Sequence, residues 1–172
     1  MEKYNQEAIK YKLKIVNKIQ SKFPDLILGG SLASYVLGYK YKEPHDIDIY
    51  TENCSIDDLL GCIGTYKEVV KSSRTDTQWQ NGKFKMHIEH GYSVGLKGTY
   101  LDFKKVRILP PYSFITVKTN WQGIEVITAS KEILEQGIRA FQNYCLDRGA
   151  LHVLEGKYKN INDVFRNREQ LI

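Results

Sequence analysis

The chain has 172 residues, of which 42% are hydrophobic and 12% aromatic, so it has enough apolar surface for a folded core and is not expected to be disordered. No apolar run approaches the ~20 residues that a membrane span needs, and the N-terminal residues lack the apolar segment of a signal peptide, so we expect a cytoplasmic protein without a membrane partner. The formal net charge of +5 favours nucleic acid or another polyanion as a partner. The three cysteines are an odd number without the spacing of a zinc site, and are expected to be reduced thiols: Cys54, Cys62 and Cys145.

Residues 5–23 predict an amphipathic helix. Ile9, Leu13 and Val16 recur at helical spacing, and the lysines between them fall largely on the outer faces. Pro24 then ends the helix and leads into the next element.

A glycine turn follows the first predicted strand. The apolar run 26–28 is too short for a helix and is typical of a buried strand. Gly29 and Gly30 allow the backbone to turn sharply and to approach a ligand closely. Ser31 is expected to cap the following helix, which Gly38 ends. A helix N-terminus behind a glycine turn offers free N–H groups, which favour phosphate.

Two acidic residues lie on the next predicted strand, 46–50. The period of a strand places Asp46 and Asp48 on one face and the isoleucines between them on the other. Two neighbouring carboxylates repel each other unless a cation lies between them. Such oxygen ligands suit Mg²⁺, which is often held by a couple of carboxylates together with substrate phosphates.

The order of these features resembles the polymerase-β-like nucleotidyltransferase superfamily, whose signature is a strand, Gly-Gly/Ser, a short helix and Asp-x-Asp on the next strand. The matching residues are Gly30, Ser31, Asp46 and Asp48. The amino-acid sequence of residues 26–50 is most similar to that of small stand-alone members found in phages, among resistance enzymes and in toxin–antitoxin pairs. The competing interpretation is an ordinary strand–helix–strand with an acidic edge.

The resemblance implies an α/β protein with the nucleotidyltransferase (polymerase-β-like) fold. We expect a mixed β-sheet with helices packed mainly on one side and a helical C-terminal tail. The expected division is a nucleotidyltransferase core at 1–128, including the N-terminal helix, and a helical tail at 129–172.

The superfamily's third carboxylate usually lies on a strand beside the Asp-x-Asp strand. Residues 83–109 predict a hairpin of two long strands that turns at 96–99. Asp102 lies between apolar residues on the return strand, where an aspartate is disfavoured unless it has a role such as metal binding. Glu89 is the competing candidate, because a shift of one residue in register exchanges the two faces. Glu125 is a more distant third.

The remaining segments give weaker predictions. Trp79 lies in a polar stretch, 72–82, that is expected to be a loop, where it either stacks on a base or anchors the loop to the body. Ser130 is expected to cap a helix. The other expected elements are a helix at 55–63 and strands at 68–71, 113–117 and 123–127.

Two segments near the C-terminus are similar to parts of the toxin branch. Residues 136–141 match the ending of one of its helices but have Gly137 where a lysine is expected, and 157–165 match a tail pattern at Lys159 and Asp163 but lack its histidine. These departures count against membership of that branch.

The resemblance implies a metal-dependent nucleotidyltransferase that moves a nucleoside monophosphate from an NTP, ATP among them, to a hydroxyl acceptor. Mg²⁺ or Mn²⁺ would be held by Asp46, Asp48 and Asp102, which are the predicted catalytic residues. The phosphates would be bound by the glycine turn and a basic residue of the loop before the acidic strand: Gly29, Gly30, Ser31 and Lys42.

The mild positive charge favours an RNA acceptor, such as a tRNA 3′ end, with a protein side chain second and an aminoglycoside-type small molecule third. A different class of function is a non-catalytic nucleotidyltransferase-fold binding protein, such as an antitoxin-like partner or a phage inhibitor. The position of the third carboxylate discriminates between the enzyme and the binding protein.

Overall fold

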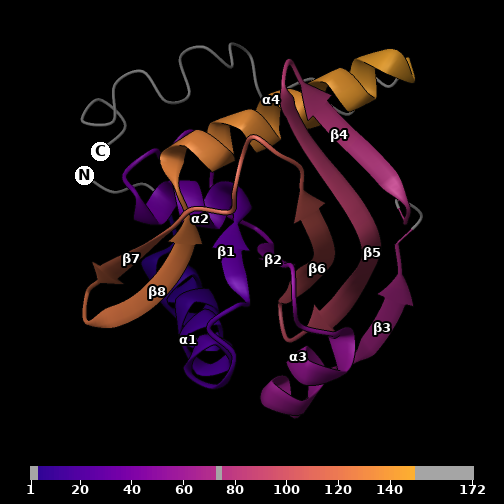
Figure 1. Cartoon of the computed structure of the whole chain (residues 1–172). Helices are drawn as coiled ribbons and strands as arrows, with labels where there is room; N and C mark the ends of the chain where they lie inside the picture. The colour runs from indigo at the N-terminus through magenta and orange to yellow at the C-terminus, as the bar shows by residue number, and fades with distance from the viewer. Residues whose placement is uncertain (1–3, 73–74, 150–172) are drawn as a thin grey trace.

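The computed structural model describes residues 4–72 and 75–149, which form one mixed sheet with helices around it (Figure 1). The helices are α1 (Gln6–Lys22), α2 (Gly30–Val36), α3 (Ile56–Ile63) and α4 (Lys131–Asp147). The strands are β1 (Ile27–Gly29), β2 (Ile47–Thr51), β3 (Glu68–Lys71), β4 (Thr77–Asn81), β5 (Phe84–Leu96), β6 (Thr99–Ile108), β7 (Thr116–Trp121) and β8 (Ile124–Ala129).

The strand order in the sheet is β3-β5-β6-β2-β1-β8-β7, and β4 pairs with the same long strand β5 as β3 does. The pairs β2–β6 and β1–β8 are parallel, whereas the remaining pairs are antiparallel. The predicted mixed sheet and its β5–β6 hairpin are therefore confirmed. This strand order places β2, which carries Asp48, between β1 and β6 at the centre of the sheet.

Helix α1 forms where the periodicity predicts it. The side chain of Asn5 caps its N-terminus by accepting from the Ala8 N–H. Gln20 ties the helix to the sheet, because its Nε2 donates to the carbonyls of Leu26 and Ile127 at 2.8 and 2.7 Å. The apolar face of the helix is fully buried through Ile9, Leu13, Val16 and Ile19.

The helices do not all pack on one side of the sheet. Helix α1 contacts α3 and β8, whereas α4 contacts α2, β4 and β5. Asp102 and Ile108 lie on one face of β6 because they are an even number of residues apart. Ile108 pairs with Met86, which pairs with Trp79 beneath α4. Helix α4 therefore covers part of the face that carries Asp102, which corrects the expectation of helices mainly on one side (Figure 1).

The polar stretch 72–82 contains a strand, so its prediction as a loop was wrong. Trp79 lies on β4, pairs with Met86 and is only 4% exposed. Its ring packs on Phe141 and Tyr144 of α4, with ring centroids 5.2 and 6.2 Å apart. Pairing with β5 and packing under α4 stabilise a strand whose residues have little local preference for one. Trp79 is thus an anchor and not an exposed stacking platform.

Other predictions differ in their boundaries or lie outside the described residues. The strand predicted at 113–117 begins at Thr116, and its hairpin turns at Gln122 and Gly123. Helices were predicted correctly at α3 and α4, where Ser55 and Ser130 are the N-caps.

No helix in the described part of the chain is long and apolar enough to cross a membrane. The three cysteines are buried and unbridged. Residues 150–172, with Lys159 and Asp163, lie outside the described residues.

Candidate active site

A row of four paired residues crosses the centre of the sheet. Asp48 of β2 pairs with Gly29 of β1 on one side and with Asp102 of β6 on the other, and Asp102 pairs with Ser93 of β5. Residues directly opposite each other on neighbouring strands present their side chains on the same face. The structure therefore places the carboxylates of Asp48 and Asp102 side by side.

The competing carboxylate, Glu89, lies at a β-bulge. The pairing of β5 with β6 shifts between Ile88 and His90, so Glu89 is the extra residue and has no partner on β6. The bulge also changes which residues of β5 face the site, because Ile88 before it and Ser93 after it lie on one face despite an odd separation. Asp102, and not Glu89, is thus the carboxylate beside Asp48.

The environment of Asp102 is unfavourable for a negative charge. Burial raises the pKa of the Asp102 carboxyl above its ordinary value. The Lys104 ammonium opposes this rise, whereas the negative charges of Asp48 and Asp46 add to it, and a hydrogen bond from Ser93 lowers the pKa slightly. The negative charge of Asp102 is therefore less favourable here than in water, mainly because the carboxyl is buried.

Lys104 is a basic residue of the site that the sequence analysis did not identify. Its Nζ lies 3.7 Å from Oδ1 of Asp48 and 5.2 Å from the centre of the Tyr50 ring. The sequence feature that could have identified Lys104 is its position two residues after Asp102 on a strand, because this spacing places both side chains on the same face.

The glycine turn lies directly against Asp48. Helix α2 begins at Gly30 with Gly29 as its N-cap, so the prediction that Ser31 caps the helix was wrong, and Ser31 lies in the first turn. Gly30 has a φ of +65°, and a Cβ built on it would overlap the Asp48 carboxylate. A Cβ on Gly29 would overlap the ring of Tyr50. Both glycines are needed because any side chain would separate the turn from the acidic strand.

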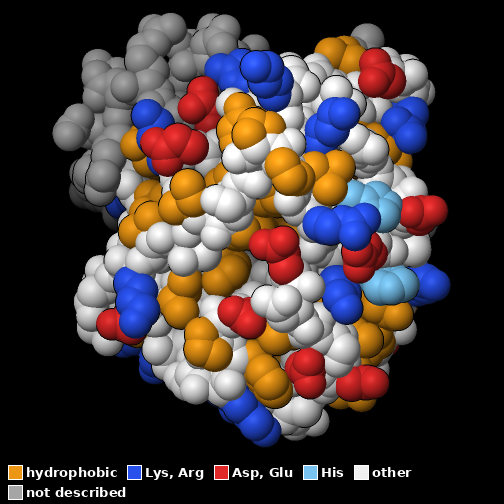
Figure 2. Space-filling model, in the orientation of Figure 1, with side chains coloured by type: hydrophobic (Ala, Val, Ile, Leu, Met, Phe, Trp, Pro, Cys, Tyr) orange, Lys and Arg blue, Asp and Glu red, His pale blue; other side chains and the backbone are white. Residues whose placement is uncertain are grey.

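These residues line a pocket of about 460 Å³ with two chemically different ends. Acidic side chains lie near the centre of this face of the molecule, with hydrophobic side chains above them (Figure 2). The polar end is formed by Gly29, Gly30, Ser31, Lys42, Asp46, Asp48, Asp102 and Lys104. The apolar end comes from β4, β5, α4 and the loop before β7, and includes Trp79, Phe84, Met86, Phe114, Ile138 and Phe141.

The apolar end holds one unsatisfied polar group. The indole Nε1–H of Trp79 is buried and has no hydrogen-bond partner among the described residues. Buried donors of this kind are rare in native structures and call for a partner such as water or a ligand. The pocket thus combines an apolar wall at one end with charged groups at the other.

In the positions that the structure shows, the acidic side chains of the pocket provide only part of a divalent-metal site. No three His, Cys, Asp or Glu side chains within residues 4–72 and 75–149 form a preformed metal cage, although Asp46 lines the same pocket as Asp48 and Asp102. Two observations favour a cation: the carboxylates of Asp48 and Asp102 lie side by side, and the Lys104 ammonium lies against Asp48. Mg²⁺ commonly takes one or two carboxylates and completes its shell with waters and phosphates, so the donor set is suitable.

Replacing Asp102 with asparagine is expected to stabilise the metal-free protein more as the pH rises. Because the folded pKa of Asp102 is raised, the unfolded chain releases this proton first, so the free energy of unfolding falls as the pH rises from the ordinary carboxyl range through the folded pKa. Asparagine removes that loss. Urea unfolding in EDTA between about pH 3.5 and 7 measures the difference between variant and wild type. A difference that stays constant with pH would contradict the prediction.

The central sheet, its acidic pair and the glycine turn together define an α/β protein with a nucleotidyltransferase fold. The structure is similar to that of a "putative nucleotidyltransferase" from Thermotoga maritima, with a TM-score of 0.62 and 16% sequence identity over 90% of this chain and 96% of that chain. This likeness confirms the predicted fold. No protein-family model and no curated protein sequence matches the chain.

Proposed function

We propose that the protein is a metal-dependent nucleotidyltransferase that moves a nucleoside monophosphate from an NTP to a hydroxyl acceptor. The observation that carries this proposal is the pairing of Asp48 with Asp102 beneath a glycine turn that leaves no room for a side chain. Paired carboxylates suit a divalent metal ion, and the first backbone N–H groups of a helix suit phosphate oxygens, so the site has groups for both parts that nucleotidyl transfer needs.

The polar end of the pocket would bind the triphosphate. The first N–H groups of a helix have no acceptor within the helix, so those at Gly30 and Ser31 are suited to phosphate oxygens, as is the Ser31 hydroxyl. Lys42 and Lys104 line the same end and would offset the negative charge of the phosphates. The apolar end would hold the base.

Bound Mg²⁺ or Mn²⁺, held by Asp46, Asp48 and Asp102, would supply positive charge at the α-phosphate and the pyrophosphate. The acceptor oxygen forms a bond to the α-phosphorus as the bond to the bridging oxygen of pyrophosphate breaks. The hydroxyl proton would pass to the carboxylate of Asp102, which lies beside Asp48 in the sheet. Pyrophosphate leaves with the electron pair of the broken bond.

The proposal is tested by incubating the protein with Mg²⁺ or Mn²⁺ and each α-³²P-labelled NTP, together with total RNA or a protein lysate. We expect label on one acceptor class with the wild type, and none with a variant carrying both Asp46→Ala and Asp48→Ala. The absence of label with every NTP, combined with binding of RNA or protein, would instead favour the non-catalytic binding protein.

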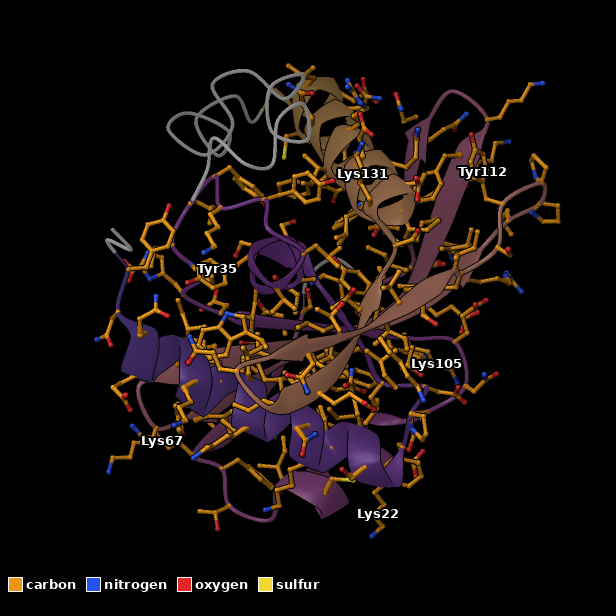
Figure 3. The ribbon with its side chains drawn as sticks, turned by 90° about the vertical axis from the view of Figure 1, so that its left-hand side faces the viewer. Lys22, Tyr35, Lys67, Lys105, Tyr112 and Lys131 are labelled. Carbon is orange, nitrogen blue, oxygen red and sulfur yellow. The ribbon has the colours of Figure 1, made fainter. Side chains whose placement is uncertain are left out.

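Replacing Lys104 with methionine is expected to raise the KM for the NTP at least about tenfold, since a hydrogen bond to a charged group is worth about 1.5–3 kcal/mol. The matched control is Lys105→Met, because Lys105 is the next residue of the strand and faces the opposite side of the sheet (Figure 3). Steady-state label transfer at varied NTP concentration measures both variants. Equal KM values for the two would show that Lys104 does not act on the phosphates.

A further inference from the structure

We propose that Gly137 of α4 makes room for the nucleotide base in the active-site pocket, and so determines which bases the site accepts. The inference rests on the proposed function and adds a specificity-determining residue to it. Gly137 lies in the interior of the helix Lys131–Asp147, a position where glycine is unfavourable.

Neither the backbone nor the packing of α4 requires a glycine at position 137. The φ of Gly137 lies outside the left-handed region that favours glycine, in contrast to that of Gly30. Apart from its chain neighbours and the backbone of its own helix, a Cβ built on Gly137 would meet nothing within 4 Å. Glycine in a helix interior lowers stability relative to alanine, because its backbone loses more freedom on folding. The fold alone would therefore favour alanine here.

The empty space beside Gly137 belongs to the active-site pocket. Gly137 lines this pocket, as do Ile133, Leu134 and Phe141 of the same helix. These three residues are four before, three before and four after Gly137, so all of them lie on one face of α4. A side chain at position 137 would therefore extend into the pocket among large apolar neighbours. Its absence leaves a gap in the apolar wall of the pocket.

The base is the part of an NTP that fits this gap. The phosphates would bind at the polar end of the pocket, and the ribose joins them to a base at the apolar end, where Gly137 lies. Every base has a flat π-face, and the rings of Phe114 and Phe141 line the same end. Glycine allows a backbone to approach a ligand closely, so the base can lie against α4 at this position. A purine, with two rings, needs more of this space than a pyrimidine.

The test measures binding by isothermal titration calorimetry with Mg²⁺ and without an acceptor, so that its outcome does not depend on catalysis. The ligands are ATP, GTP, CTP, UTP and tripolyphosphate, which has the phosphates but no base. We expect Gly137→Ala to raise the Kd of the purine NTPs at least about tenfold, since one methylene in an apolar pocket changes affinity about 10- to 200-fold. The pyrimidine NTPs are expected to lose less affinity, and the Kd of tripolyphosphate is expected to stay unchanged. Gly137→Leu, which keeps a good helix former, is expected to weaken NTP binding further.

Gly61→Ala is the matched control, because Gly61 is an exposed glycine of helix α3 outside the residues that line the pocket. Gly61 also has no positive φ, and a Cβ there meets nothing within 4 Å. Both alanine variants are expected to melt about 1–4 °C above the wild type, because alanine is the better helix former. Only Gly137→Ala is expected to lose affinity for NTPs, and a loss of affinity in a stabilised protein cannot come from misfolding.

The inference is overturned if Gly137→Ala binds the NTPs as the wild type does, or if tripolyphosphate or the pyrimidine NTPs lose as much affinity as the purine NTPs. It is also overturned if Gly61→Ala has the same effect on binding, or if Gly137→Ala melts below the wild type. Failure of the proposed function has a different signature: NTP binding depends on Gly137 as expected, but no NTP gives label transfer.

Discussion

An Asp48→Asn variant is expected to transfer label at least about 100-fold more slowly than the wild type, which is the size of effect seen when one preorganised electrostatic group is removed from an active site. Asparagine has nearly the same shape as aspartate, but it has no charge with which to hold a divalent metal. Asp48 pairs with both Gly29 and Asp102, so it lies between the glycine turn and the second carboxylate of the row. Among the four paired residues Gly29, Asp48, Asp102 and Ser93, only Asp48 has both the glycine turn and a second carboxylate as neighbours.

The substitution also tests metal binding separately from catalysis. Asp48 carries a neighbouring ammonium at 3.7 Å and is not fully buried, so the variant is expected to fold. Mg²⁺ titration followed by thermal melting gives a second readout, since a metal that binds only the folded wild type raises its stability by mass action. We expect this increase to be lost in the variant.

The matched control is Asp57→Asn, which makes the same change at an exposed carboxylate in the first turn of α3, outside the residues that line the active-site pocket. It is expected to retain transfer and the response to Mg²⁺. Transfer at the wild-type rate by Asp48→Asn would remove the acidic pair from the mechanism.

A Gly30→Ala variant is expected to lose activity far more than its loss of stability explains. The alanine must adopt a φ of +65°, which costs about 1–2 kcal/mol. In addition its Cβ overlaps the Asp48 carboxylate, so either the turn or the carboxylate must move. Displacement of reacting groups by about 1 Å is enough to lower a rate about 100-fold, and we expect a loss of at least that size.

Gly82→Ala is the matched control for this variant. Gly82 has a φ of +57° in the β4–β5 turn, and a Cβ there meets nothing within 4 Å. Both variants are therefore expected to show the cost of the positive φ in urea unfolding, with a further loss in Gly30→Ala from the overlap with Asp48, whereas only Gly30→Ala loses transfer. Equal activity of the two would show that the close approach of the turn to Asp48 has no part in catalysis.

The local features of the site could be predicted from the sequence because they depend on short-range rules. The glycine pair and the alternation of Asp48 with the buried Ile47 and Ile49 each involve neighbours only a few residues apart. The same holds for helix α1, whose periodicity identified its buried face. The choice of Asp102 over Glu89, of which the structure places Asp102 beside Asp48, used a local property too, since aspartate between apolar residues of a strand needs a reason.

Other features required the tertiary structure because they depend on which strands become neighbours. The single extra residue at Glu89 reverses the faces of β5, and a bulge has no clear signal in the alternation before it. β4 exists because β5 and α4 support it, although its own residues are polar. The proximity of Lys104 to Asp48 follows from the parallel pairing of β2 with β6.

The sequence by itself determined the first strand, the glycine turn and the acidic strand, and hence the class of chemistry expected, since local backbone preferences and side-chain periodicity act within a few residues. The tertiary structure alone decided that Asp48 and Asp102 lie side by side and that α4 closes an apolar end on the same face. Those arrangements join segments far apart in the chain, and their register is set by the packing of the whole sheet.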